Sequence, residues 1–132
     1  MLSIFSRIIH REIPGYILAE NDRFIAILDI MPLVMGHALV IPKKEQSYIF
    51  DMKDHELAEL MIFAQPIAKA IQSVVPCQRI GVSVIGLEVP HVHIHLVPIN
   101  SADDLNFTRP KLKPTSEELS SLTAKIRSAL HG

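Results

Sequence analysis

The sequence has few of the features that mark several classes of protein. It contains a single cysteine, Cys77, which cannot form an internal disulfide and is typical of a reducing cytoplasm. Its formal net charge of −1 gives no basic excess for binding nucleic acid or an anionic membrane. No apolar run approaches the ~18 residues of a membrane-spanning helix, and the segment 1–7 lacks the character of a signal peptide. We therefore expect a cytoplasmic protein without nucleic-acid or membrane partners.

The chain does contain enough apolar sequence for one folded domain. Apolar residues make up 48% of its 132 residues, which excludes a disordered chain and suffices for one substantial core. No linker or internal repeat divides it. We predict a single domain over residues 1–132, with a main region over 1–98, a polar loop over 99–114 and a last helix over 115–131.

Three of the seven histidines alternate with apolar residues in Pro-His-Val-His-Ile-His-Leu-Val, which begins at Pro90. In a β-strand, successive side chains point to opposite faces, so His91, His93 and His95 would share one face. The apolar residues between them would fill a core on the other. Imidazole is the side chain that changes protonation near neutral pH, so this pattern indicates a functional site rather than surface histidines without a role.

Metal binding and catalysis are the two functional interpretations of these histidines. His-x-His can offer two neutral nitrogens to zinc. However, strand geometry places the Cα atoms of His91 and His95 roughly 13 Å apart, and one ion with bonds of about 2 Å would have to reach both. In a catalytic site one imidazole attacks and its neighbours hold the oxygens and leaving group of the substrate. The geometry favours catalysis.

The histidine segment resembles the signature of the histidine-triad (HIT) family of nucleotide hydrolases and transferases, His-φ-His-φ-His-φ-φ with φ apolar. Residues 29–32, Asp-Ile-Met-Pro, and 36–43, Gly-His-Ala-Leu-Val-Ile-Pro-Lys, are similar to its nucleoside-pocket segment. Residues 4–14 are similar to its amino-terminal helix and loop. The resemblance covers residues 3–100 and implies the family's fold and chemistry.

The resemblance implies a nucleotide-binding hydrolase acting at the α-phosphate of nucleoside phosphoramidates or related nucleotides through a covalent nucleotidyl-histidine intermediate. Dinucleoside polyphosphates are an alternative substrate class, and a non-catalytic nucleotide-binding or scaffold module is an alternative function. No cofactor is implied. The expected partners are a purine nucleotide or nucleoside phosphoramidate and, as the family suggests, a second copy of the chain in a homodimer.

The family motif implies a role for each histidine. His93 is the nucleophile, because a neutral imidazole is nucleophilic at neutral pH and its phosphoryl adduct is readily hydrolysed. His95 hydrogen-bonds a phosphate oxygen or the leaving atom, and His91 helps to orient the site. His37 supports the triad from the neighbouring strand; a structural histidine is the alternative there.

Nucleotide-binding residues follow from the same resemblance. Asp29 matches the position that receives the ribose 2′- and 3′-hydroxyls, as a carboxylate accepts two hydrogen bonds from a cis-diol. A strand or turn cap is the alternative for Asp29. The base is expected among apolar side chains. The predicted apolar residues are Phe5, Ile8, Ile27 and Ile30, and the further predicted nucleotide-binding residues are Ser83, Gly86 and Glu88.

The chain departs from the family where many relatives bind a structural zinc ion. Ser3 and Ser6 stand in the places of two cysteines, and Glu45 stands in that of a histidine. Hydroxyls are poor zinc ligands, so we predict no metal site.

Two further departures lie beside the triad. Residues 86–88, Gly-Leu-Glu, put Glu88 where a phosphate-facing serine or threonine is usual. A protonated Glu88 could donate a hydrogen bond to the phosphate. Alternatively, Pro90 could turn the chain so that Glu88 points at solvent or at the loop 99–114. Residues 98–100, Pro-Ile-Asn, replace the Pro-Arg that often follows the triad.

The expected fold is α+β: a five-stranded antiparallel sheet with helices packed on one face, the HIT-like fold. We expect Asp51 and Asp54 to begin a long helix, which Pro66 should kink. The polar loop 99–114 is unusually long, so it should be a lid or pack on a partner. Strands are predicted at 16–19, 23–28, 37–41, 79–85 and 91–98, and further helices at the Ser3 cap and at the Thr115–Glu118 capping box.

Overall fold

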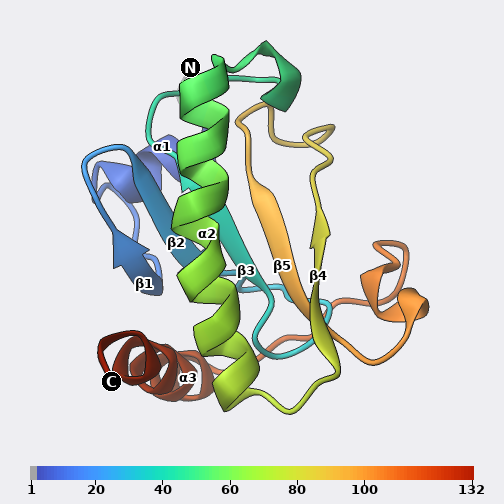
Figure 1. The fold of residues 1–132 in the computed structure, drawn as a ribbon. Helices are drawn as coiled ribbons and strands as arrows, with labels where there is room; N and C mark the ends of the chain where they lie inside the picture. The colour runs from blue at the N-terminus through green and yellow to red at the C-terminus, as the bar shows by residue number, and fades with distance from the viewer. Residues whose placement is uncertain (1–2) are drawn as a thin grey trace.

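A five-stranded antiparallel sheet forms the centre of the computed structural model, which describes residues 3–132 (Figure 1). The strand order is β1-β2-β3-β5-β4, so the triad strand β5 lies inside the sheet beside β4, as predicted. The α+β class is confirmed. The strands are β1 (Ile17–Glu20), β2 (Phe24–Leu28), β3 (Ala38–Pro42), β4 (Arg79–Ser83) and β5 (Ile94–Ile99), and the helices are α1 (Ile4–Ile9), α2 (Asp54–Val74) and α3 (Ser116–His131).

Helices cover both faces of the central strands, which explains why β2 and β3 are buried at every position. The two long helices, α2 and α3, pack on one face, as predicted (Figure 1). The short helix α1 packs on the opposite face, where Phe5 and Ile8 join a second apolar cluster with residues of β2 and β3. Among residues 3–132, no helix has the length and apolarity needed to cross a membrane.

The long helix begins later than predicted. A short 3-10 turn occupies Ile49–Asp51, and α2 starts at Asp54 with Lys53 as its N-cap and no side-chain cap. The reason is that Met52 has an extended backbone and a buried side chain, so the chain turns into the core before the helix begins. Pro66 lies within α2 and does not end it.

The triad strand is also shorter at its start than predicted, since β5 begins at Ile94. Its partner β3 ends at Pro42, which has no backbone N–H to extend the ladder. The backbone N–H of Val92 instead donates to the carbonyl of Gln46 at 2.7 Å. The predicted caps at Ser3 and Thr115 are both present.

Candidate functional site

The three triad histidines lie on the sheet face covered by α1. His91, His93 and His95 are 0, 8 and 8% exposed, and the apolar residues between them belong to the core under α2 and α3. The predicted alternation is therefore present, although only His95 lies within β5.

His93 presents one unprotonated nitrogen. Its Nδ1 lies 2.7 Å from the main-chain carbonyl oxygen of His91. A carbonyl only accepts, so Nδ1 carries the proton and Nε2 carries the lone pair. Burial lowers the pKa of His93, which favours the neutral ring. The rings of Phe5 and His95 each pack edge-on at 4.8 Å between centroids. His93 is thus a neutral ring with its proton on Nδ1 and its lone pair on Nε2, the protonation state of a nucleophilic imidazole.

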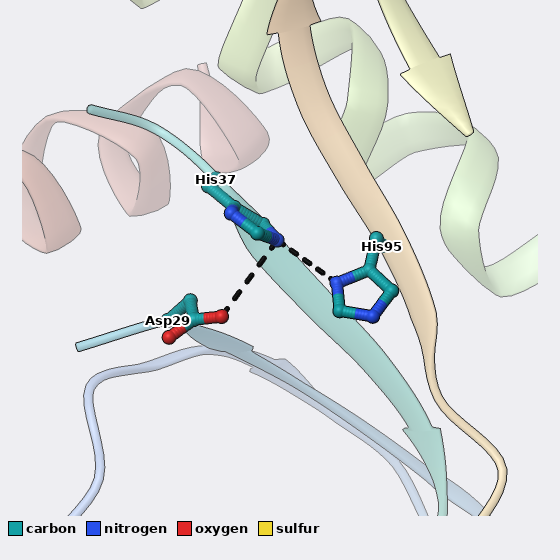
Figure 2. A group of neighbouring side chains, drawn as sticks. All are labelled: Asp29, His37 and His95. Carbon is teal, nitrogen blue, oxygen red and sulfur yellow. Dashed lines mark hydrogen bonds and ion pairs between the residues drawn. The ribbon is translucent and has the colours of Figure 1, made fainter. Parts of the chain in front are cut away.

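A hydrogen-bonded chain fixes His37 and His95 in the opposite tautomer (Figure 2). The backbone N–H of Leu33 donates to Nδ1 of His37 at 3.0 Å, so the proton of His37 is on Nε2. That Nε2 donates to Nδ1 of His95 at 2.9 Å, which leaves the proton of His95 on its own Nε2. Burial lowers the pKa of His37 to about 4 and that of His95 to about 3. Both rings are therefore neutral at pH 7, and His95 offers an N–H.

Asp29 follows β2 and completes this group (Figure 2). Its Oδ1 accepts from the backbone N–H of Met31 at 2.9 Å, the turn cap that the sequence allowed. Its Oδ2 lies 3.7 Å from Nε2 of His37, too far for a hydrogen bond. Burial raises the pKa of the Asp29 carboxyl. Oδ2 is thus the oxygen that can accept from a ligand.

Asp29, His37 and His95 are also the group best placed to hold a metal ion among residues 3–132. Each offers one ligand atom, and the three atoms lie within 4.8 Å of one another. However, two of these atoms, Nε2 of His37 and Nδ1 of His95, already share a hydrogen bond. A metal would have to break that bond, which orders both rings, so the arrangement fits a hydrogen-bonded relay better.

His91 is held by a separate network that joins it to α1. Its Nε2 donates to the carbonyl of Pro42 at 2.7 Å, so its Nδ1 accepts from the hydroxyl of Ser3 at 2.5 Å. The carboxylate of Glu45 accepts from the backbone N–H of Ser3 at 3.1 Å and from the hydroxyl of Ser6 at 2.8 Å. The residues at the zinc positions of relatives thus form a hydrogen-bonded cluster.

The predicted base-binding residues divide into two groups. Phe5, Ile8 and Ile27 are buried together in the cluster between α1 and the sheet, and Phe5 also contacts the rings of His91 and His93. Ile30, in contrast, is 58% exposed. The structure therefore gives the site an apolar floor beside the triad and one apolar side chain open to solvent.

The predicted residues at the end of β4 and in its connection to β5 differ in exposure. Ser83 pairs with His95 in the β4–β5 ladder and is half-buried. Gly86 has a φ of +72°, a left-handed conformation that favours glycine. Glu88 is exposed and forms no hydrogen bond or ion pair with any residue of 3–132. Of the two orientations proposed for Glu88, the structure has the one toward solvent.

Two residues that the sequence did not indicate lie at this site, both in the loop 99–114. The ring of Phe107 packs edge-on to that of His95 at 4.7 Å between centroids. The positive charge of Lys111 acts on the site as well: it opposes the rise that burial causes in the pKa of Asp29, and it adds to the fall that burial causes in the pKa of His37. The sequence offered one signal that this loop contacts the site, which is an aromatic residue, Phe107, within a polar segment.

Comparisons with known proteins show the family and the fold of this chain. The model of the HIT domain family matches residues 10–102. Adenosine 5′-monophosphoramidase HNT1 of Saccharomyces cerevisiae is 40% identical over 72% of this chain and 61% of its own length. Adenosine 5′-monophosphoramidase hnt1 of Schizosaccharomyces pombe is 32% identical over 98% of this chain and 99% of its own. The crystal structure of a Hit-like protein involved in cell-cycle regulation from Bartonella henselae has a TM-score of 0.84 at 32% identity, covering 96% of this chain and 95% of that one.

Proposed function

The chain belongs to the histidine-triad (HIT) family, and from this premise we propose that it is a nucleotide hydrolase with His93 as its covalent nucleophile. The observation that carries the proposal is the tautomer of His93. Its Nδ1–H is bound to the carbonyl of His91, so a neutral imidazole presents the lone pair of Nε2. Such a nitrogen can attack a phosphorus atom directly, without a separate base.

Two displacements complete the proposed reaction. In the first, Nε2 of His93 forms a bond to the α-phosphorus, and the bond from phosphorus to the leaving atom breaks. A leaving amine takes its proton from solvent, whereas a leaving phosphate departs with the electron pair as an anion. In the second, the oxygen of water bonds to phosphorus, the N–P bond breaks, and a nucleoside monophosphate and a proton are released.

The neighbouring histidine stabilises this reaction as a donor. The His37–His95 hydrogen bond puts the proton of His95 on Nε2, so His95 can donate to a phosphate oxygen or the leaving atom. Preorganised donors of this kind stabilise the charge that develops at phosphorus in the transition state. Because the pKa of His95 is lowered to about 3, His95 acts at neutral pH as a hydrogen-bond donor rather than as an imidazolium acid.

Nucleoside phosphoramidates are the first substrate class to test, since two relatives carry the name adenosine 5′-monophosphoramidase. Dinucleoside polyphosphates follow, because the same attack at the α-phosphate would cleave them. In either case Oδ2 of Asp29 is the acceptor proposed for the ribose hydroxyls, as Oδ1 is already bound to Met31.

Trapping the adduct tests the proposal. We expect adenosine 5′-monophosphoramidate, given in a rapid-quench experiment, to add one adenylyl group to the peptide that contains His93. The variant His93→Ala should form no adduct and lose turnover by several orders of magnitude, while still binding AMP. Adenylate binding by the unaltered protein without an adduct or turnover would instead favour the non-catalytic binding module.

We also infer a homodimer formed through β4. This strand lies at the edge of the sheet, and an open edge carrying exposed apolar side chains favours association. The exposed apolar side chains of β4 and the following loop are Val82, Val84, Ile85 and Leu87. Light scattering should give twice the chain mass, and Val82→Lys should shift it to the monomer; a monomer before substitution would contradict the inference.

A further inference from the structure

The loop that follows β5, residues 100–114, packs on two of the histidines of its own chain. The ring of Phe107 lies edge-on to His95 at 4.7 Å and to His37 at 6.1 Å between centroids. The backbone N–H of Leu112 donates to the carbonyl of Pro32 at 2.9 Å, which ties the loop to the segment between Asp29 and His37. The loop is therefore part of the wall of the proposed site.

Main-chain carbonyls hold the ammonium group of Lys111 in this loop. Its Nζ donates to the carbonyl of Phe107 at 2.6 Å and to that of Arg109 at 3.1 Å. An ammonium group has three donors, so one N–H stays available. Within residues 3–132, no carboxylate lies in ion-pair range of Lys111, whereas the nearby Arg109 is paired with Asp103 and Asp104.

The charge of Lys111 reaches the site. It opposes the rise in the pKa of the Asp29 carboxyl that burial causes, and it adds to the fall in the pKa of the His37 imidazole that burial causes, so its field acts where the ribose and the relay histidine are expected. The imidazoles of His37 and His95 are neutral at pH 7, and they contribute donors but no positive charge. The anionic groups of a nucleotide bound here would therefore face Lys111, whose charge no carboxylate of the described residues neutralises in an ion pair.

We propose that Lys111 is a specificity-determining residue that binds the leaving phosphate when the α-phosphate of a nucleotide is joined to a further phosphate. Lys111 thus adds nucleoside and dinucleoside polyphosphates to the substrates of the site, and the inference rests on the proposed function. Nε2 of His93 bonds to the α-phosphorus, the bridging P–O bond breaks, and its electron pair stays on the leaving phosphate. That anion needs no proton to depart, and the free N–H of Lys111 neutralises it. Phe107 links Lys111 to the histidines, because its carbonyl accepts a hydrogen bond from Lys111 and its ring packs on His95.

A matched pair of variants tests Lys111. Lys111→Met keeps the aliphatic stem and removes the charge, and Lys113→Met does the same at an exposed position of the same loop. For diadenosine tetraphosphate, Lys111→Met should lower kcat/KM about 10- to 100-fold, the usual effect of losing a charged hydrogen bond. For adenosine 5′-monophosphoramidate its effect should be less than about fivefold, as should that of Lys113→Met on both substrates. Lys111→Arg should retain most of the activity on the polyphosphate.

Salt provides a second readout. Rising ionic strength should reduce kcat/KM for diadenosine tetraphosphate more in the unaltered protein than in Lys111→Met, because salt screens the attraction between a half-buried ammonium group and the phosphate. Equal losses on both substrates would assign Lys111 to loop structure alone and overturn the proposal. So would an unchanged kcat/KM on the polyphosphate.

Binding separates this proposal from the proposed function. If the unaltered protein turned over neither substrate and formed no adduct, the hydrolase would be refuted. Calorimetric titration with ATP and AMP would still decide the role of Lys111. Lys111→Met should weaken ATP about 10- to 100-fold and AMP much less, whereas equal affinities for ATP before and after substitution would overturn the assignment.

Discussion

Acid should destabilise this fold through His37 well before carboxyl groups titrate. The pKa of His37 falls from its ordinary 6.5 to about 4 because burial disfavours the charged ring. Below pH 6.5 His37 therefore binds a proton in the unfolded chain, whereas in the folded chain it stays neutral down to about pH 4. The free energy of unfolding is unaffected by this group above about pH 7, and it decreases as the pH falls from about 6.5 towards 4.

The size of the effect follows from the shift. Each pH unit within this window costs at most about 1.4 kcal/mol per histidine, so His37 should reduce the free energy of unfolding by roughly 2 kcal/mol between pH 7 and pH 5. Burial also lowers the pKa of His95 and His93, which therefore act in the same direction. Three carboxyl groups, Glu20, Asp104 and Glu118, have lowered pKa values and reduce the stability only near and below the ordinary range of carboxyl groups. The raised pKa of Asp29 acts in the opposite direction to the histidines.

Urea unfolding at pH 7, 6 and 5 measures the effect. The variant His37→Asn keeps an acceptor for the backbone N–H of Leu33 but has no titrating ring. We expect it to be less stable at pH 7 and to have a shallower pH dependence, by roughly 1 kcal/mol per pH unit. His131→Asn, at an exposed position at the end of α3, is the control and should keep the original slope. Identical slopes for His37→Asn and the unaltered protein would show that His37 protonates freely in the fold, and the assigned tautomers of His37 and His95 would then be wrong.

Three further predictions concern the rest of the site. Asp29→Ala should weaken ribonucleotides by about 1.5–3 kcal/mol and narrow their advantage over 2′-deoxyribonucleotides; equal losses for both sugars would make Asp29 structural. Chelators should leave activity and Tm unchanged, and elemental analysis that found one zinc ion per chain would contradict the assignment of Ser3, Ser6 and Glu45 as a hydrogen-bonded cluster. Because Glu88 faces solvent, Glu88→Ser should leave the pH–rate profile unaltered from about pH 5 to about pH 9; a gain at alkaline pH would place its carboxylate against the phosphate.

The parts of the fold that the sequence predicted are those with a regular pattern. Alternation of histidines with apolar residues correctly placed the triad on one face of the sheet, because the period of a strand depends only on local geometry. The start of α2 was predicted wrongly at Asp51, since polar residues suited to a cap are not sufficient where the core draws in Met52. Local capping preference was overridden by tertiary packing.

The loop 99–114 shows a second limit. It has no periodicity that would fix its position, and the sequence left open whether it covers the site or a partner. Its place is set by contacts far apart in the chain, such as the bond from Leu112 to Pro32. Phe107 and Lys111 therefore could not be assigned to the site before the fold was known.

The protonation state of each histidine could not be predicted from the sequence either, because backbone groups determine it. The carbonyl of His91 orients His93, the carbonyl of Pro42 orients His91, and the N–H of Leu33 orients His37. A carboxylate in these places would favour the imidazolium form, whereas a backbone group selects the tautomer without adding a charge. In the proposed reaction His93 would thus stay neutral and nucleophilic near an anionic substrate. The carboxylate of Asp29, which lies beyond hydrogen-bond distance of His37, would stay available to the ribose.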